Sequence, residues 1–155
     1  MNASHWIIAA AAFLCAEPVQ AGVNDPEVLM YRFPGVLDTG TVSFTGVATV
    51  FHCTNFSGVS ENMRFVTRRK DGLLLSNQPL FINHLETKTV QTHGTFAYTG
   101  DLTLTTGLVS QGTMAIAATS TNIICTAMTI DASTVAPVGV ALRGIRFNPV
   151  PGSQE

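Results

Sequence analysis

The stretch NMRFVTRRKDG, residues 62–72, alternates apolar and polar side chains and ends in a dipeptide typical of tight turns. Met63 and Phe65 would face one side of a strand while Arg64 faces the other, which is the period of two that a half-buried strand shows. Asp71-Gly72 favours a hairpin, because both residue types tolerate the positive φ angles that short hairpin turns require. The stretch therefore predicts a strand that leads into a β-hairpin.

The same alternation of strand and turn signals continues along the chain. Runs rich in Val, Ile, Phe and Thr are typical of strands, and Gly- or Pro-containing pairs such as Pro34-Gly35, His93-Gly94 and Gln111-Gly112 are typical of turns. The expected strands lie in VATVFHC (47–53), NMRFVTRR (62–69), GLLL (72–75), LETKTVQT (85–92), DLTLTT (101–106), TMAIAA (113–118), NIICTAMTI (122–130) and VGVALRGIRF (138–147). We therefore expect an all-β fold, an antiparallel β-sandwich of about 7–9 short strands.

This sandwich is expected to be immunoglobulin-like or fibronectin-like at most in architecture. An immunoglobulin domain proper packs a buried tryptophan against its disulfide, and it carries a tyrosine two residues before its second cysteine. Here the only tryptophan is Trp6, and Ile123 stands two residues before Cys125.

The composition is that of one globular domain without a strong charge bias. The chain has 155 residues, of which 46% are hydrophobic and 12% are charged, and its formal net charge is −2. Nucleic acids and anionic membranes attract proteins with an excess of basic residues. The overall charge gives no reason to expect either partner.

The N-terminus has the features of an export signal. The apolar run WIIAAAAFLCA is followed by VQA, in which Val19 and Ala21 are the small residues that signal peptidase requires. The preceding MNASH lacks Lys and Arg, so either the chain starts elsewhere or His5 and the amino terminus supply the charge. We expect a signal peptide over residues 1–21, an N-terminal extension and first turn over 22–40, the β-sandwich over 41–148 and a polar tail over 149–155. The mature protein would be extracytoplasmic (periplasmic, at the cell surface or secreted) and would have no integral membrane segment.

Removal of residues 1–21 would leave Cys53 and Cys125 as the only cysteines. Two cysteines in an exported chain favour a disulfide, with two separate buried thiols as the alternative. Both lie in expected strands, and paired cysteines have Cα atoms about 5 to 6 Å apart. No Cys-x-x-Cys is present and the three later histidines lack ligand spacing, so we expect no metal and no cofactor.

Asp38-Thr39-Gly40 matches the triplet of aspartic-protease catalytic loops. A retropepsin-like chain of this size would dimerise to bring two such carboxylates together, but the later aliphatic pair followed by glycine is absent. The alternative is a turn in which the Asp38 carboxylate accepts a backbone N–H, and its loss would then cost at most about 1 kcal/mol. A serine with His84 or His93 and Asp101 is a further hydrolase hypothesis, without a G-x-S-x-G motif to support it. We expect no catalytic residues.

Four basic residues, Arg64, Arg68, Arg69 and Lys70, gather near the expected hairpin tip. They would suit an anionic glycan or an acidic protein partner. The alternative is that charged side chains on an exposed edge strand prevent sheet-to-sheet aggregation.

Three segments carry a resemblance to known proteins: VFHCTNFSGV (50–59), TSTNIICTAMTIDA (119–132) and RFNPVPGSQE (146–155). Their CTN, CTAM and Arg-Phe-Asn-Pro blocks resemble those of a group of small exported bacterial proteins of uncharacterised function. The resemblance covers most of the chain after Thr45, and it implies a bacterial exported two-cysteine β-domain.

These observations together predict an exported, non-enzymatic β-sandwich. It would act as a binding or structural module in the periplasm or at the cell surface, with an envelope protein or a glycan as its partner. The alternative is a small secreted hydrolase, either a retropepsin-like protease at Asp38 or a serine hydrolase.

Overall fold

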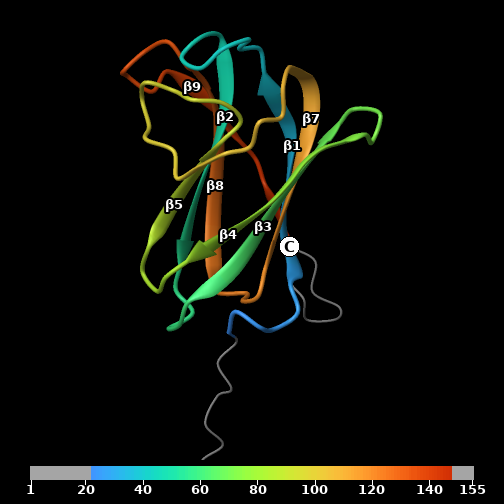
Figure 1. Cartoon of the computed structure of the whole chain (residues 1–155), viewed down its shortest axis with the longest axis vertical. Coiled ribbons are helices and arrows are strands. Elements are labelled where there is room, and N and C mark those ends of the chain that lie inside the picture. Colours follow the sequence, from blue (N-terminus) through green and yellow to red (C-terminus); the bar gives the residue numbers. More distant parts are fainter. Residues whose placement is uncertain (1–21, 148–155) are drawn as a thin grey trace, which may run out of the picture.

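The computed structural model describes residues 22–147, and in this range the chain folds as an all-β sandwich (Figure 1). The expected leader and the tail over 149–155 lie outside the described residues. The strands are β1 (Val28–Asp38), β2 (Val47–Asn55), β3 (Glu61–Arg69), β4 (Leu74–Ile82), β5 (Thr87–Gln91), β6 (Leu102–Thr103), β7 (Val109–Ala118), β8 (Ile123–Asp131), β9 (Gly139–Leu142) and β10 (Ile145–Arg146). Residues 22–147 include no helix of the length and apolarity needed to cross a membrane.

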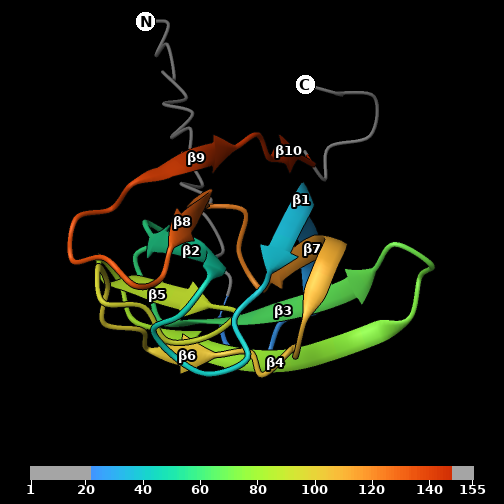
Figure 2. The ribbon, with the colours of Figure 1, turned by 90° about the horizontal axis from the view of Figure 1, so that it is seen from above.

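The strands form two sheets of five, and Figure 2 shows them as two layers seen from the end. Sheet A has the order β10-β1-β7-β3-β4, and sheet B has the order β6-β5-β2-β8-β9. Neighbouring strands are antiparallel except β5 and β6, which pair in parallel. The predicted antiparallel β-sandwich is confirmed, although residues 22–147 form ten strands where about 7–9 were expected, and two of them, β6 and β10, are only two residues long.

The sequence does not predict β1, because Pro34-Gly35 has the composition of a turn. In the structure these residues form a bulge inside the strand, where Gly35 has a φ of 85° and the register with β7 shifts between Pro34 and Val36. The strand pairs with both β7 and β10. The sandwich therefore begins at Val28, and most of the expected extension over residues 22–40 is a strand of sheet A.

The β3–β4 hairpin confirms the turn at Asp71-Gly72. Gly72 has a φ of 87° and donates from its backbone N–H to the Arg69 carbonyl, while the Arg69 N–H donates to Leu73. Met63 and Phe65 are fully buried, so the alternation along β3 directs its even-numbered residues to the outer face of sheet A.

Aromatic side chains from both sheets form the centre of the core. Phe33 of β1 meets Phe51 of β2 edge to face with ring centroids 5.6 Å apart, and Phe51 lies 6.5 Å from Phe65 of β3. At one end Thr49 of sheet B links the sheets directly, because its hydroxyl accepts from the Leu37 N–H at 2.9 Å and donates to the Leu37 carbonyl at 2.8 Å. This link fixes the alignment of β1 with β2 where β1 ends.

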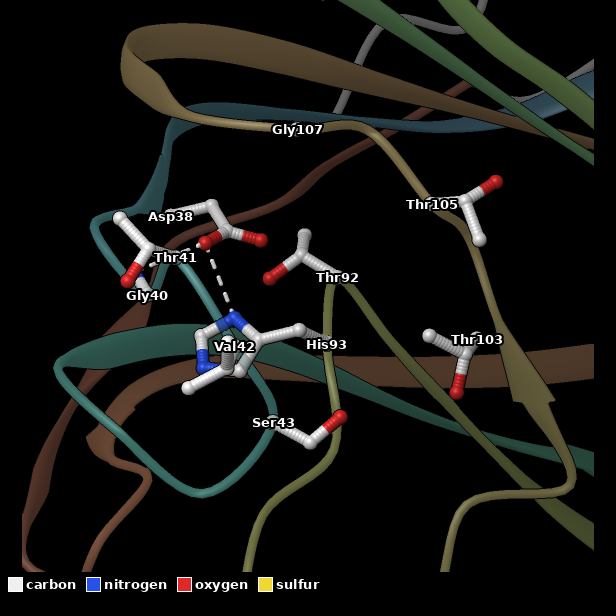
Figure 3. Close-up of a pocket in the computed structure, with 10 residues that line it drawn as sticks. All are labelled: Asp38, Gly40, Thr41, Val42, Ser43, Thr92, His93, Thr103, Thr105 and Gly107. Atoms are coloured by element: carbon white, nitrogen blue, oxygen red, sulfur yellow. Dashed lines mark hydrogen bonds and ion pairs between the residues drawn. The ribbon is translucent and has the colours of Figure 1, made fainter.

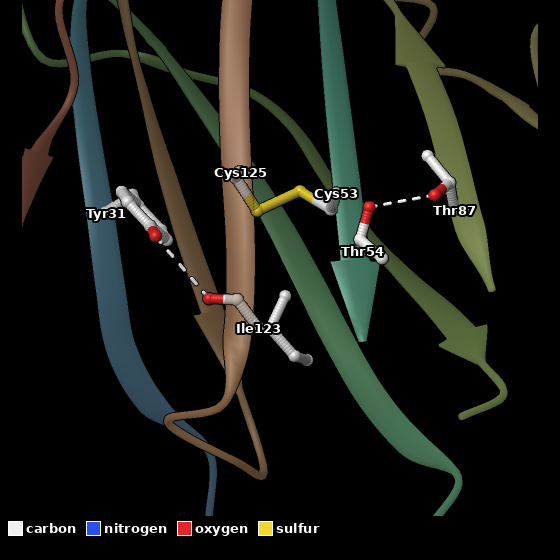
Figure 4. Close-up of a disulfide and its surroundings, with 6 residues drawn as sticks. All are labelled: Tyr31, Cys53, Thr54, Thr87, Ile123 and Cys125. Carbon is white, nitrogen blue, oxygen red and sulfur yellow. Dashed lines mark hydrogen bonds between the residues drawn. A yellow bond between two sulfur atoms is a disulfide. The ribbon is translucent and has the colours of Figure 1, made fainter. Parts of the chain in front are cut away.

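The Cys53–Cys125 disulfide joins β2 to β8 within sheet B (Figure 4). The predicted pairing is confirmed, but the predicted Cα separation is wrong, since the two Cα atoms lie 4.1 Å apart. The cysteines are direct register partners on neighbouring strands. Such partners approach to about 4.5 Å at non-hydrogen-bonded positions of an antiparallel pair. The disulfide is compatible with an extracytoplasmic location.

Candidate functional site

A polar pocket of about 280 Å³ opens at the end of the sandwich where β1 ends (Figure 3). Its walls come from the β1–β2 loop, the loop after β5 and the segment that follows β6. Five of its ten lining residues carry hydroxyl groups, namely Thr41, Ser43, Thr92, Thr103 and Thr105, and Asp38 and His93 lie beside them. Thr105 has a φ of 48°, which is costly for a β-branched residue.

Asp38 is the last residue of β1 and is only 2% exposed. Its Oδ1 atom accepts the Gly40 N–H at 3.1 Å, which confirms the predicted turn. The same oxygen lies 2.9 Å from His93 Nδ1, and Oδ2 accepts a long hydrogen bond from the Thr106 hydroxyl at 3.5 Å. Asp38 is therefore a buried tertiary anchor as well as a turn residue.

His93 follows β5 and is 9% exposed. Its Nε2 atom lies 2.9 Å from the Thr45 carbonyl oxygen and must carry a proton there, because a carbonyl oxygen only accepts. The Nδ1 atom faces the Asp38 carboxylate, but this contact is not aligned as a hydrogen bond.

The expected hairpin turn at His93-Gly94 is wrong, because β5 and β6 pair in parallel and parallel strands are joined by a crossover. The loop over residues 92–101 instead folds over the outer face of sheet B. There Tyr98 packs against the His52 ring, with centroids 4.6 Å apart.

The described residues around Asp38 do not assemble a hydrolase geometry. Asp38 faces a histidine of its own chain, whereas an aspartic protease needs a second carboxylate at that position. His93 Nε2, the atom that would accept a proton from a serine nucleophile, is held by the Thr45 carbonyl.

The other residues of the serine-hydrolase hypothesis form hydrogen bonds with different partners. The Asp101 carboxylate accepts the Thr89 N–H at 2.7 Å and lies 3.3 Å from the Lys88 ammonium. His84 Nδ1 accepts the Gly58 N–H at 3.0 Å. What the pocket offers is a set of hydroxyl groups beside the buried contact between Asp38 and His93.

The four predicted basic residues divide between two places. Arg64 and Arg68 lie on the outer face of β3, an interior strand with β7 on one side and β4 on the other. Arg69 ends β3, and Lys70 lies in the hairpin turn. Edge protection does not explain Arg64 and Arg68, because the edge strand beside β3 is β4, whose sequence LLSNQPLFI has no charged residue.

Two of these residues are neutralised locally. Arg64 forms a bidentate pair with Glu27 at 2.6 and 3.0 Å, and this hydrogen bonding raises the pKa of Arg64. Arg69 pairs with Asp71 at 2.6 Å, and this contact lowers the pKa of Asp71 to about 2. Among residues 22–147, no carboxylate forms an ion pair with Arg68 or Lys70.

Arg32 of β1 joins Arg64 and Arg68 on the same surface. The register pairs Arg32 with Ala115 of β7 and Ala115 with Val66 of β3, which alternates in phase with the two β3 arginines. We call the outer surface of sheet A around Arg32, Arg64 and Arg68 the arginine face. The β7 residues between β1 and β3 on this face are small: Thr113, Ala115 and Ala117.

Sequence reasoning missed Arg32 and the Asp38–His93 pair. Both depend on strand register or on contacts between segments distant in the chain, so no local sequence pattern predicts them. In comparisons with known proteins, no protein-family model, no curated protein and no solved structure matches the chain. Its function is therefore inferred from the residues and their geometry.

Proposed function

We propose that this protein is an exported, non-enzymatic binding module of the bacterial periplasm or cell surface, and that it binds an anionic envelope glycan through the arginine face. The observation that carries the proposal is the position of Arg32 and Arg68. Both are exposed on interior strands of sheet A, and neither has a carboxylate partner within the described residues.

Guanidinium groups suit such a ligand, because their planar set of donors pairs with carboxylate, sulfate or phosphate through two parallel hydrogen bonds. Arg32 and Arg68 are separated by β7, which puts their strands about 10 Å apart. The small β7 side chains leave room between them for an extended sugar chain. A polymer with repeated anionic groups would contact both arginines at once.

Export is part of the same proposal. It rests on the apolar leader over residues 1–21, on the resemblance to exported bacterial two-cysteine proteins and on a disulfide that suits an oxidising compartment. Mass spectrometry of the protein recovered from cells tests it. The expected N-terminus is Gly22, and an intact Met1 would contradict export by this signal.

Binding is tested by salt-gradient elution from immobilised alginate and dextran sulfate, which carry carboxylate and sulfate groups respectively. The Arg32→Gln/Arg68→Gln variant should elute at markedly lower salt than the unchanged protein. Lys88→Gln is the control for the single variant Arg68→Gln, because it removes one positive charge from sheet B, where Lys88 lies between Glu86 and Asp101. Equal losses in both variants would indicate attraction by net charge alone, and absence of retention would contradict the proposal.

The hydrolase alternative makes the opposite prediction for the Asp38 pocket. It requires turnover of peptide or ester substrates that Asp38→Asn abolishes in a folded protein. The binding-module proposal expects no turnover by either form, with the melting temperature as the check on folding.

A further inference from the structure

Four loops free of Asp, Glu, Lys and Arg gather at the end of the sandwich that holds Asp38 and His93. They cover residues 39–46, 92–100, 104–108 and 132–138. Main-chain hydrogen bonds connect three of them: Phe44 N to Gly94 O, Phe96 N to Ala132 O and Ala132 N to Gly46 O. Figure 1 shows the loops together at the upper end of the molecule. We call them the loop end.

The loop end exposes large apolar side chains. Six of them are between 43% and 80% exposed: Val42, Phe44, Phe96, Leu108, Val135 and Val138. The rings of Phe44 and Phe96 stack on each other, with centroids 4.5 Å apart, outside the core. Phe44 also has a φ of 67°, a conformation that costs free energy for any residue except glycine. An exposed apolar surface of this kind marks a site of interaction.

We propose that the loop end attaches the protein peripherally to a lipid bilayer, with Phe44, Phe96 and Leu108 inserted at the boundary between headgroups and acyl chains. Charged side chains are costly at that depth, and these loops have no carboxylate, ammonium or guanidinium group. The apolar side chains come from separate loops, and a fluid bilayer accepts them without a partner surface of matching shape.

Charges beside the loops complement the phosphate groups of lipids. The backbone N–H of Lys70 donates to the backbone carbonyl of Gln111, near the start of β7. This bond brings the β3–β4 hairpin tip, with the Lys70 ammonium and the exposed Leu73, to the loop end. The nearby acidic groups are already held: Asp38 by His93, Asp71 by Arg69, and Asp131 by the N–H and hydroxyl of Ser133.

This attachment is separate from the arginine face and does not depend on the net charge of the chain. The overall charge of −2 gives no reason for membrane attraction. Insertion of apolar side chains gains free energy from the apolar area removed from water, and salt does not screen that gain.

The test is cosedimentation of the exported protein with phosphatidylcholine vesicles, after mass spectrometry has established that its leader is absent. We expect binding that persists at high salt. Phe44→Ser/Phe96→Ser should lower the partition coefficient by about tenfold or more, because two inserted aromatic side chains are lost. The matched control is Phe56→Ser/Leu85→Ser, which removes equally exposed side chains at the opposite end and should leave binding unchanged. Leu108→Ser provides a second variant if the Phe44/Phe96 variant melts early.

Anionic phosphatidylglycerol in the vesicles should strengthen binding moderately, and Lys70→Gln should remove that increment. Absence of vesicle binding by the unchanged protein would overturn the proposal, as would equal losses in the variant and its control. Sedimentation velocity without vesicles tests the competing occupant. A dimer that dissociates in Phe44→Ser/Phe96→Ser would mean that a second copy covers the loop end. Retention on the polysaccharide columns is a separate measurement, so failure of either proposal leaves the other standing.

Discussion

Each end of the sandwich buries a carboxylate, but the two carboxylates differ in the number of polar partners around them. At the loop end Asp38 is surrounded by the Gly40 N–H, the His93 ring and the Thr106 hydroxyl. At the opposite end Glu61 is fully buried, and its Oε2 accepts a hydrogen bond from the Thr119 hydroxyl. Its Oε1 has no hydrogen-bond partner among the described residues.

The two ends therefore obtain their stability from different interactions. A buried carboxyl group with few donors costs free energy, so Glu61 is a poor source of stability for its end. The disulfide between β2 and β8 lies toward that same end, where Asn55 pairs with Ile123. The loop end has no such covalent link among the described residues, and the Asp38–His93 pair holds its loops together. The stability of one end should therefore depend mainly on the disulfide, and that of the other mainly on the contact between Asp38 and His93.

Reduction of the disulfide should give the largest effect. Cys53 and Cys125 are 72 residues apart in sequence. Closing a loop of that length restricts the unfolded chain by about 4 kcal/mol in the chain-entropy account. Thermal denaturation with and without reductant should show a fall in melting temperature of roughly 10 to 20 °C. The Cys53→Ala/Cys125→Ala variant should melt at the lower temperature whether or not reductant is present. If reduction left the melting temperature of the unchanged protein the same, the disulfide would not be the main source of stability at the Glu61 end.

Substitution of Asp38 comes next in size. The turn alone predicts a loss of at most about 1 kcal/mol, but Asp38 also contacts the buried His93, and a buried polar group left without its partner costs about 1 to 3 kcal/mol. We therefore expect Asp38→Ala to lower the free energy of unfolding by about 2 kcal/mol, measured by urea denaturation. A double-mutant cycle with His93→Ala isolates the pair and should give a coupling of about 1 to 3 kcal/mol. Additive losses would mean that the contact between Asp38 and His93 contributes nothing to stability.

Glu61→Met should change the free energy of unfolding by less, and should raise it. Methionine fills a similar volume without a buried polar group, and the Thr119 hydroxyl keeps the Asn62 N–H and carbonyl as partners. We expect a gain of about 1 kcal/mol in the free energy of unfolding. A loss of similar size in urea denaturation would show that Glu61 is better satisfied than its hydrogen bonds indicate.

The smallest effect concerns His52 on the outer face of sheet B. Burial lowers the pKa of His52 from its usual value of 6.5. Because the unfolded chain then binds the proton more readily, the stability from this group is complete above pH 6.5 and declines as the pH falls through the folded pKa. An NMR titration should place the ring midpoint below 6.5, and His52→Gln should remove that part of the pH dependence. A midpoint above this value would contradict the packing against Tyr98.

Local patterns predicted the strands that alternate cleanly, but not those interrupted by glycine. β3 and its hairpin follow from alternation and from Asp71-Gly72. Gln111-Gly112 looks like a turn yet lies inside β7, where a Cβ on Gly112 would meet the Arg68 carbonyl oxygen at 2.9 Å. A glycine needed for close approach and a glycine needed for a turn look the same in sequence.

The candidate sites show a similar limit. The basic residues of β3 are evident in sequence, but whether their strand lies at an edge or in the interior depends on β4 pairing outside it. That position changes the interpretation from edge protection to a binding face. Asp38 is likewise evident as a turn residue. Its contact with His93 is not, because His93 lies in another loop that only the packing of the two sheets brings close.

Binding of an anionic glycan to the arginine face can be located by an NMR titration. Amide resonances of the protein would be followed while short alginate oligosaccharides are added. We expect shifts concentrated on β1, β7 and β3 around Arg32, Ala115 and Arg68, and loss of those shifts in Arg32→Gln/Arg68→Gln. Shifts centred instead on the pocket of Asp38 and His93, or no shifts at all, would contradict binding at the arginine face.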